Sequence, residues 1–306
     1  MIQESQYRSL GLSGIKVSPL GAGTNRWAQG RNDKAVFQTF GSLVDAGVNL
    51  FDTAEVYNGG KSERLLGKCA RQDSRPVVIA SKFAPLPTRL SSRQFMSALD
   101  ASLSRLGVQT IDLYYIHWPF MTFLSVRKMM DMMAQAVEAG KVRAVGVSNF
   151  SAEQMRRAAD RLARYDIPLA ANQVYYNLLH RQPEVNGVLD ACRELNVALI
   201  AFFPLASGRL ALGASRPAAS SRSSSSAREK QQEVLQETLH SIAQKRGKSV
   251  SQVVLNWLLY RDEHVIPIPG ATNARHALEN ADALTWELSD DEFAAIDQAS
   301  SGDSQP

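Results

Sequence analysis

Residues 77–117 read VVIASKFAPLPTRLSSRQFMSALDASLSRLGVQTIDLYYIH, and this stretch contains one complete structural unit. The runs Val77–Lys82 and Ile111–His117 are rich in aliphatic, β-branched and aromatic residues, which is typical of buried strands. Between them, Ser92–Leu106 has the apolar spacing of an amphipathic helix and stops before Gly107, a residue that often ends helices. A strand, a helix and a second strand in this order predict two parallel strands joined by a crossover helix.

The same unit recurs along the chain. Eight strand-like runs begin 27–34 residues apart, except that the last begins 68 residues after the seventh. The runs are Val17–Gly23, Val48–Asp52, Val77–Lys82, Ile111–His117, Val142–Val147, Leu169–Val174, Val197–Phe202 and Val265–Ile268. Eight βα units in 306 residues predict an α/β protein with a closed (β/α)8 TIM barrel.

Further signals mark helices between the strands and additions to the barrel. Helices are expected over Asp33–Ala46 and Val126–Ala139, and capping boxes at Ser151–Gln154 and Ser289–Glu292. Tyr7–Leu10 and Ile15–Val17 flank a glycine-containing turn, which predicts an N-terminal β-hairpin at the bottom of the barrel. Arg228–Arg246 and Val250–Tyr260 share the long gap, so extra C-terminal helices are expected.

The chain shows no composition break or linker near its middle, so residues 1–306 are expected to form a single domain. The one low-complexity stretch, Ser215–Ser226, is too polar to pack. It is expected to be a flexible surface loop, and a lid over a ligand is the alternative because loops after barrel strands line the active face.

Composition excludes several classes of protein. The chain is 44% hydrophobic and 21% charged with a net charge of +4, so a large core is available and disorder is excluded. The charges are interspersed, which argues against nucleic-acid binding. Cys69 and Cys192 predict buried thiols instead of a disulfide framework or a metal site. Without a long apolar run or a signal peptide, a cytoplasmic protein without a membrane partner is expected.

Two familiar motifs fail on inspection. Gly21-Ala-Gly23-Thr-Asn-Arg26 begins like a dinucleotide-binding fingerprint, but arginine replaces the third glycine, which close packing of helix on strand requires. Tyr57 and Lys61 have the Tyr-x-x-x-Lys spacing of short-chain dehydrogenases, but that pair works from a helix, and the two intervening glycines disfavour one.

A more informative set of side chains lies at the carboxyl ends of three adjacent strands, where barrel enzymes place their chemistry. Asp52 ends the second strand with Tyr57 shortly after it, Lys82 ends the third and His117 ends the fourth. Each alone has an ordinary explanation, as a helix cap, a packed ring, a surface lysine or a core histidine. Together they predict a catalytic site.

Here the sequence resembles the aldo-keto reductase superfamily over essentially its whole length. The resemblance rests on Phe51–Tyr57 (FDTAEVY), Ser62-Glu63, Leu66-Gly67, Ser81-Lys82, His117-Trp118-Pro119, Gly146–Phe150 (GVSNF), Gln173, Tyr176-Asn177, Pro204-Leu205, Ile268-Pro269-Gly270 and Glu279-Asn280. It implies a barrel that binds NADPH without a Rossmann fold and an enzyme that reduces aldehydes or ketones to alcohols by hydride transfer.

The chemistry assigns a role to each member of the set. A carbonyl that accepts hydride needs a proton donor, and a phenol with a pKa of about 10 is too weak an acid unless that pKa is lowered. Tyr57 is therefore expected to be the general acid and Lys82 to lower its pKa. Asp52 would anchor the lysine, and His117 would orient the substrate carbonyl.

The resemblance also implies cofactor contacts. Ser148, Asn149 and Gln173 would hold the nicotinamide carboxamide, and Phe202 would stack on the ring in place of the commoner tyrosine or tryptophan. Arg275 and His276 are the candidates for the 2′-phosphate, so NADPH is expected in preference to NADH. The expected set is Thr24, Asn25, Asp52, Ser148, Asn149, Gln173, Phe202, Phe203, Pro204, Leu205, Ser207, Gly208, Arg209, Gly270, Thr272, His276, Glu279 and Asn280.

Aromatic residues in the loops after the strands predict a pocket for a small apolar carbonyl substrate. The expected pocket residues are Trp27, Tyr57, Phe83, His117 and Trp118, with Phe120, Met121 and Phe123 nearby. The alternative to an enzyme is a cofactor-binding regulatory subunit that resembles the potassium-channel β-subunits of this superfamily. A barrel lyase or isomerase would leave the nicotinamide residues without a shared purpose.

Overall fold

The computed structural model describes residues 6–30, 32–120, 122–210 and 227–301 of the chain. Within these ranges, eight parallel strands form one sheet, in the order in which they follow one another in the sequence. They are β3 (Ala22–Gly23), β4 (Leu50–Asp52), β5 (Val78–Phe83), β6 (Ile111–Ile116), β7 (Val142–Ser148), β8 (Leu169–Tyr175), β9 (Ala198–Phe202) and β10 (Val265–Pro267). Gly21 N donates to Pro267 O (2.9 Å) and Gly23 N to Pro269 O (3.1 Å), which joins the two sheet edges. The predicted (β/α)8 barrel is confirmed.

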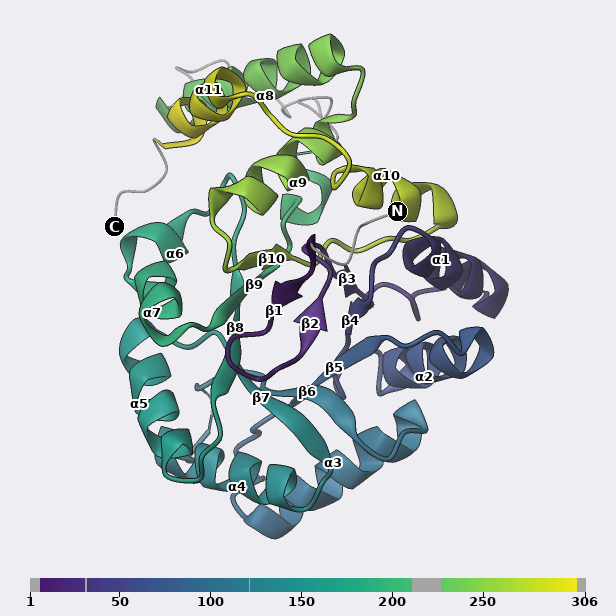
Figure 1. Cartoon of the computed structure of the whole chain (residues 1–306), viewed down its shortest axis with the longest axis vertical. Coiled ribbons are helices and arrows are strands. Elements are labelled where there is room, and N and C mark those ends of the chain that lie inside the picture. Colours follow the sequence, from purple (N-terminus) through teal and green to yellow (C-terminus); the bar gives the residue numbers. More distant parts are fainter. Residues whose placement is uncertain (1–5, 31, 121, 211–226, 302–306) are drawn as a thin grey trace, which may run out of the picture.

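Helices surround the sheet (Figure 1). They are α1 (Asp33–Asp45), α2 (Lys61–Asp73), α3 (Ser92–Leu106), α4 (Val126–Glu138), α5 (Ala152–Ala163), α6 (Gln182–Val185), α7 (Val188–Leu195), α8 (Ala227–Arg246), α9 (Val250–Arg261), α10 (Ala274–Asp282) and α11 (Asp290–Ser300). The predicted capping boxes at Ser151 and Ser289 are both present. Gly107 ends α3 with φ of 67°, in the left-handed region that favours glycine. Local signals therefore located the helix ends to within one or two residues.

An antiparallel hairpin of β1 (Arg8–Ser9) and β2 (Lys16–Val17) precedes the barrel, as predicted. Leu10, Ile15 and Val17 are buried and pack into the apolar interior of the barrel. The hairpin turn touches the amino-terminal ends of the strands, since a Cβ atom on Gly11 would lie 3.0 Å from Ala170 O. The hairpin therefore covers the end of the barrel opposite the predicted site.

The expected first strand, Val17–Gly23, was wrong in part. Lys16–Val17 pairs within the hairpin, and only Ala22–Gly23 joins the barrel sheet. Pro19, between the two, has no N–H to donate to a strand ladder. Ser18 N instead donates to the Asn49 side chain at 2.7 Å. Ser18 and Pro19 therefore separate the hairpin strand from the barrel strand.

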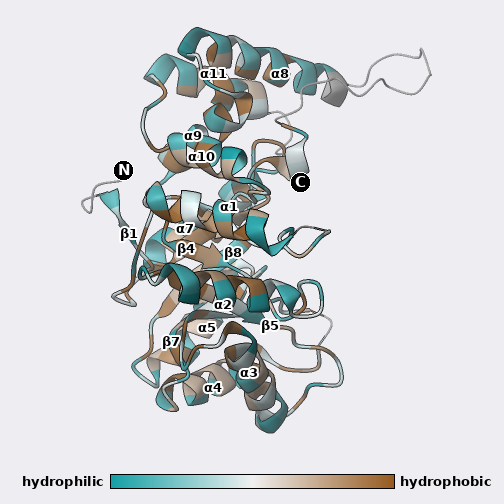
Figure 2. Cartoon of the chain, turned by 90° about the vertical axis from the view of Figure 1, so that its right-hand side faces the viewer, coloured by the Kyte–Doolittle hydropathy of each residue, from teal (hydrophilic) through white to brown (hydrophobic). Residues whose placement is uncertain are grey.

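The buried apolar residues form two layers. One fills the barrel and includes Leu50, Ala80, Leu113 and Ile200. The other lies between the strands and the surrounding helices. Figure 2 shows the corresponding pattern, with hydrophobic strands at the centre and hydrophilic faces on the outer helices. Successive strand residues alternate between the layers, so each strand position is assigned to the barrel interior or to the helix layer.

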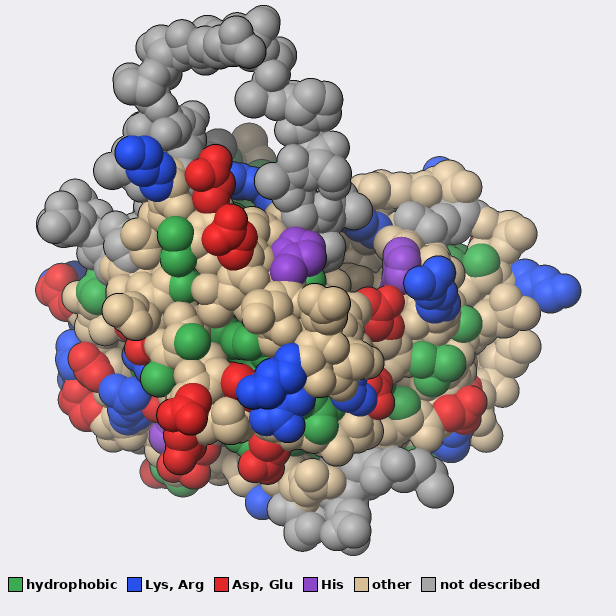
Figure 3. Space-filling view, turned by 90° about the horizontal axis from the view of Figure 1, so that it is seen from above, with side chains coloured by type: hydrophobic (Ala, Val, Ile, Leu, Met, Phe, Trp, Pro, Cys, Tyr) green, Lys and Arg blue, Asp and Glu red, His purple; other side chains and the backbone are tan. Residues whose placement is uncertain are grey.

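The extra C-terminal helices α8 and α11 lie side by side beyond one side of the barrel, where Arg246 and Glu292 form an ion pair at 2.6 Å (Figure 1). Positive and negative side chains intermix on this face (Figure 3). Cys69 and Cys192 are buried and free, as predicted. No helix in the described ranges is both long and apolar enough to cross a membrane. Met121 and the predicted loop at 215–226 lie outside the described residues.

Candidate active site

A buried ion pair joins the ends of two neighbouring strands. Lys82 Nζ on β5 lies 2.5 Å from Asp52 Oδ1 on β4 and donates to Thr53 O at 2.7 Å. Lys82 has no exposed surface, and Asp52 is 3% exposed. Gln173 Nε2 from β8 donates to the second carboxylate oxygen of Asp52 at 2.8 Å. Although burial disfavours the ammonium, the carboxylate of Asp52 and the nearby Tyr57 hold the pKa of Lys82 above its ordinary value.

Tyr57 faces this pair from the loop after β4. Its hydroxyl lies 3.5 Å from Lys82 Nζ, and the ammonium stands 5.1 Å from the centre of its ring. The turn beyond it passes through Asn58, Gly59 and Gly60, all with positive φ, and α2 begins only at Lys61. Tyr57 and Lys61 therefore do not share a helix, which agrees with the rejection of the short-chain dehydrogenase motif.

The pKa of Tyr57 differs from the expectation. Burial raises the pKa of the phenol above its ordinary value, and the opposing effect of Lys82 does not reverse that shift. Lys82 acts in the predicted direction, but desolvation of the hydroxyl dominates. The phenol is therefore protonated at neutral pH, the form that a proton donor requires.

His117 follows β6 and completes the cluster. Its ring centre lies 5.9 Å from that of Tyr57, and its backbone N–H donates to Phe83 O at 2.9 Å. Within the described residues its Nδ1 is buried without a hydrogen-bond partner. Burial, together with the charge of Lys82, lowers the pKa of His117 to about 3. The imidazole is therefore neutral at physiological pH and keeps one N–H to donate.

The three predicted carboxamide residues lie next to one another. Ser148 Oγ donates to Gln173 O at 2.9 Å, and Asn149 Nδ2 donates to His117 O at 3.1 Å. Asn149 has φ of 60°, a left-handed conformation that asparagine tolerates better than most residues. These bonds tie the ends of β6, β7 and β8 together. Of the three side chains, only Gln173 lines the cleft described next.

A cleft of about 440 Å³ runs from this cluster to α10. Most of the predicted cofactor residues line it: Thr24, Asn25, Asp52, Gln173, Phe202, Phe203, Pro204, Leu205, Ser207, Gly208, Gly270, Thr272, His276, Glu279 and Asn280, together with the catalytic candidate Tyr57. Arg209 is exposed and does not line it. Arg275 is also outside the lining, whereas Thr272 Oγ1 lies 3.1 Å from His276 Nδ1 within it.

Sequence reasoning missed several lining residues. Arg26 extends the Thr24–Asn25 loop, and Ser249, Val250 and Ser251 open α9. The capping box from Ser249 to Gln252 was readable in the sequence, but nothing there placed the start of α9 beside α10. The start of α9 reaches the cleft only through the tertiary packing of the segment between β9 and β10.

Two expected substrate residues lie in the hydrophobic core instead. Trp27 is 1% exposed, donates from Nε1 to Ala271 O at 3.0 Å and packs against Phe51. Phe83 is fully buried and packs edge-on against Phe95 of α3. Phe83 follows Lys82 on β5, and adjacent strand residues point to opposite faces, so it joins the helix layer. Neither side chain lines the cleft.

The remaining aromatic candidates lie together after β6. The rings of Trp118 and Phe120 are stacked at 6.2 Å, and that of Trp118 lies 4.5 Å from the His117 ring. Phe120 is 53% exposed and Phe123 81% exposed. These rings form an exposed apolar surface beside His117.

The cleft fits the dinucleotide that the resemblance implies. The loop after β9 passes along it with positive φ at Phe203, Ala206 and Ser207, a conformation that costs free energy and that clusters at ligand sites. Gln173 offers both a donor and an acceptor at the catalytic end. At the other end, His276 stands in the first turn of α10, where the helix dipole favours a phosphate.

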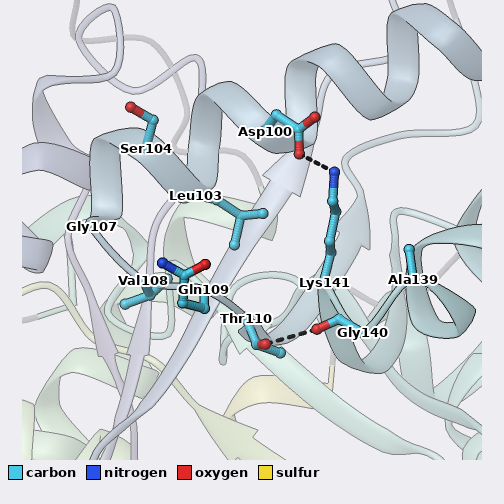
Figure 4. A pocket seen from close by; sticks show the side chains of 10 residues that line it. All are labelled: Asp100, Leu103, Ser104, Gly107, Val108, Gln109, Thr110, Ala139, Gly140 and Lys141. Atoms are coloured by element: carbon cyan, nitrogen blue, oxygen red, sulfur yellow. Dashed lines mark hydrogen bonds and ion pairs between the residues drawn. The ribbon is translucent and has the colours of Figure 1, made fainter.

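A second hollow, of about 640 Å³, lies at the opposite end of the barrel (Figure 4). The loops that precede β6 and β7 form it. Lys141 and Asp100 pair across it at 2.5 Å, and Thr110 Oγ1 donates to Gly140 O at 2.8 Å. These polar groups satisfy one another, and the hollow lacks the buried titratable cluster of the first cleft.

A parallel barrel with a buried lysine and carboxylate and a half-buried phenol beside a long cleft is the arrangement of a class of barrel oxidoreductases. The model of the family described as "Aldo/keto reductase family" matches residues 19–301. The chain is 34% identical over 319 residues to the chloroplastic pyridoxal reductase of Arabidopsis thaliana, covering 96% of this chain and 86% of that protein. The chain belongs to the aldo/keto reductase family, and the resemblance is confirmed.

Solved structures agree with this membership. The glycerol dehydrogenase of Gluconobacter oxydans superposes with a TM-score of 0.83 at 26% identity, covering 99% of this chain and 98% of that one. An aldo-keto reductase of Klebsiella pneumoniae solved in complex with NADPH has a TM-score of 0.77 at 29% identity, covering 97% and 95%. The named activities of these relatives differ, so family membership does not identify a substrate.

Proposed function

We propose that this chain is an NADPH-dependent reductase of aldehydes or ketones, with Tyr57 as its general acid. The observation that carries the proposal is the buried cluster in which Lys82 Nζ lies 2.5 Å from Asp52 and 3.5 Å from the Tyr57 hydroxyl. NADPH, when bound, supplies the hydride. The Klebsiella pneumoniae relative solved with NADPH and the phosphate-suited start of α10 support this cofactor in preference to NADH.

Each side chain then has one task. Tyr57 gives its proton to the carbonyl oxygen as negative charge develops there. Lys82 stabilises the phenolate that remains, and Asp52 keeps the ammonium in place. His117, neutral because its pKa is about 3, donates an N–H to the same oxygen and orients the substrate. In the oxidative direction Tyr57 takes the proton back.

The substrate is proposed to be a carbonyl compound with an apolar or aromatic body. Trp118 and Phe120 form a stacked pair on the open side of His117, which offers ring faces instead of charges. Pyridoxal, an aromatic aldehyde, is a specific candidate, because the Arabidopsis thaliana relative is named as a pyridoxal reductase.

The test follows the loss of NADPH absorbance with pyridoxal, aromatic aldehydes and simple ketones, and with NADH in parallel. Tyr57→Phe should lower kcat by about 10²- to 10⁴-fold, the usual contribution of a general acid, with the Kd for NADPH little changed. Tyr165→Phe is the matched control, since Tyr165 follows the C-terminus of α5, donates its hydroxyl to Asp131 on α4 and should behave as wild type.

Undiminished turnover in Tyr57→Phe would overturn the assignment of the acid. NADPH binding without turnover on any carbonyl tested would favour the regulatory-subunit alternative.

A further inference from the structure

Tyr115 lies directly beside the catalytic ion pair on the inner face of the barrel. The strand register places it opposite Lys82 of β5 and, on its other side, opposite Gly146 of β7. Paired residues on parallel strands project to the same face of a sheet. Lysine, tyrosine and glycine therefore form a row across the barrel interior. Asp52 pairs with Ala80, so this row lies two residues closer to the carboxyl ends of the strands than the register position of Asp52.

Two aromatic rings lie near the ammonium of Lys82. Its Nζ is 5.6 Å from the centre of the Tyr115 ring and 5.1 Å from that of Tyr57. Both distances are within about 6 Å, the range of a cation–π interaction, which is strongest where the cation is desolvated. Lys82 and Tyr115 have no exposed surface, so water does not weaken this contact.

Gly146 makes room for this arrangement. A Cβ atom there would lie 2.5 Å from Cδ1 and 2.6 Å from Cε1 of Tyr115, closer than atoms can pack. Its absence lets the ring lie against β7. Burial, followed by the charge of Asp52, raises the pKa of Tyr115 well above its ordinary value, so the ring stays neutral. A neutral ring presents the same electron-rich face to the ammonium at every working pH.

We infer that Tyr115 is a positioning residue, whose ring face holds the ammonium of Lys82 below the Tyr57 hydroxyl. Asp52 and Thr53 O hold the ammonium by hydrogen bonds, and the Tyr115 ring adds a contact from β6. This inference rests on the proposed roles of Lys82 and Tyr57. Tyr115 reaches neither the surface nor the cleft, so its loss should slow proton delivery and leave substrate binding unchanged.

The experiment compares Tyr115→Phe with variants that carry phenylalanine with one, two or three ring fluorines at position 115. Fluorine withdraws electron density from the ring face but hardly changes its shape, so folding is preserved. Tyr115→Phe, which also removes the hydrogen bond between the Tyr115 and Gln173 side chains, is the reference for the single-turnover rate of reduction at saturating NADPH. Relative to Tyr115→Phe, the single-turnover rate should fall with each added fluorine. The largest reduction should be roughly 2- to 30-fold, which corresponds to the loss of one cation–π contact, and KM should not change.

A second comparison repeats the series in an Asp52→Asn/Lys82→Met background, where no ammonium remains and no carboxylate is left buried without its cation. There the fluorines should have no effect on the rate or on the urea midpoint. Equal rates across the fluorinated series in the wild-type background would overturn the inference. An equal decrease in rate per added fluorine in both backgrounds would also overturn it. The urea midpoints measure the Lys82–Tyr115 contact without any turnover. A fully active Tyr57→Phe variant would contradict the proposed function, and the midpoints would still test the contact.

Discussion

Replacing Lys82 with methionine removes the positive charge that faces the Tyr57 hydroxyl and leaves a side chain of similar length. The two groups are 3.5 Å apart. At an effective dielectric constant of about 20, a full charge on the phenolate would interact with the ammonium by about 5 kcal/mol, and half a charge by about 2.5 kcal/mol. Because the transition state carries part of that charge, we expect the chemical step to slow by roughly 10²- to 10³-fold.

The same change leaves Asp52 buried without its cation. Removing one partner of a buried ion pair costs about 3–5 kcal/mol, and burial already raises the pKa of this carboxyl. We therefore pair Lys82→Met with the double variant Asp52→Asn/Lys82→Met, which removes the stranded charge and keeps the hydrogen-bonding amide beside Gln173. The double variant should recover stability in urea denaturation but not the rate.

The assay is single-turnover reduction, monitored by NADPH absorbance, with urea unfolding measured on the same preparations. A loss of less than about tenfold in the single variant, or recovery of the rate in the double variant, would refute the electrostatic role of Lys82. If the single variant alone fails to fold, the cause is the buried charge of Asp52 left without its cation. The rate of the double variant then still measures the contribution of Lys82 to the chemical step.

Two further predictions concern histidines. Because the pKa of His117 is about 3, this group stays neutral above that pH. The pH profile of kcat/KM should therefore show no titration of His117 between about pH 5 and 8. A titration near pH 6.5 that disappears in His117→Asn would contradict this. His276 lines the cleft and Arg275 does not, so His276→Ala should raise the Kd for NADPH more than the Kd for NADH. Arg275→Ala is the matched control from the next position, and equal effects of the two variants in a fluorescence titration would remove His276 from the phosphate site.

The catalytic candidates were readable from the sequence because a parallel barrel gathers the carboxyl ends of its strands at one face. Asp52 ends β4, Lys82 is the last residue but one of β5 and His117 directly follows β6, so their meeting needed only the strand order. Trp27 and Phe83 lie in the hydrophobic core, which the sequence did not show, because proximity along the chain does not reveal which way a side chain points. Phe83 is one residue beyond Lys82, and that single step moves a side chain from the barrel interior to the helix layer.

The periodic strands and helix ends in the sequence determined the barrel, its hairpin and the strand ends that carry the chemistry, since these depend on local spacing and burial. Only the tertiary structure decided that the start of α9 reaches the cleft, that His276 lines it while Arg275 does not, and that Tyr115 lies against Lys82. Such contacts depend on how distant segments pack. They also depend on where a side-chain atom would clash, as a Cβ atom at Gly146 would with Tyr115. Charge and burial at the site are likewise properties of the closed barrel, which is why the pKa of Tyr57 shifted against the expectation.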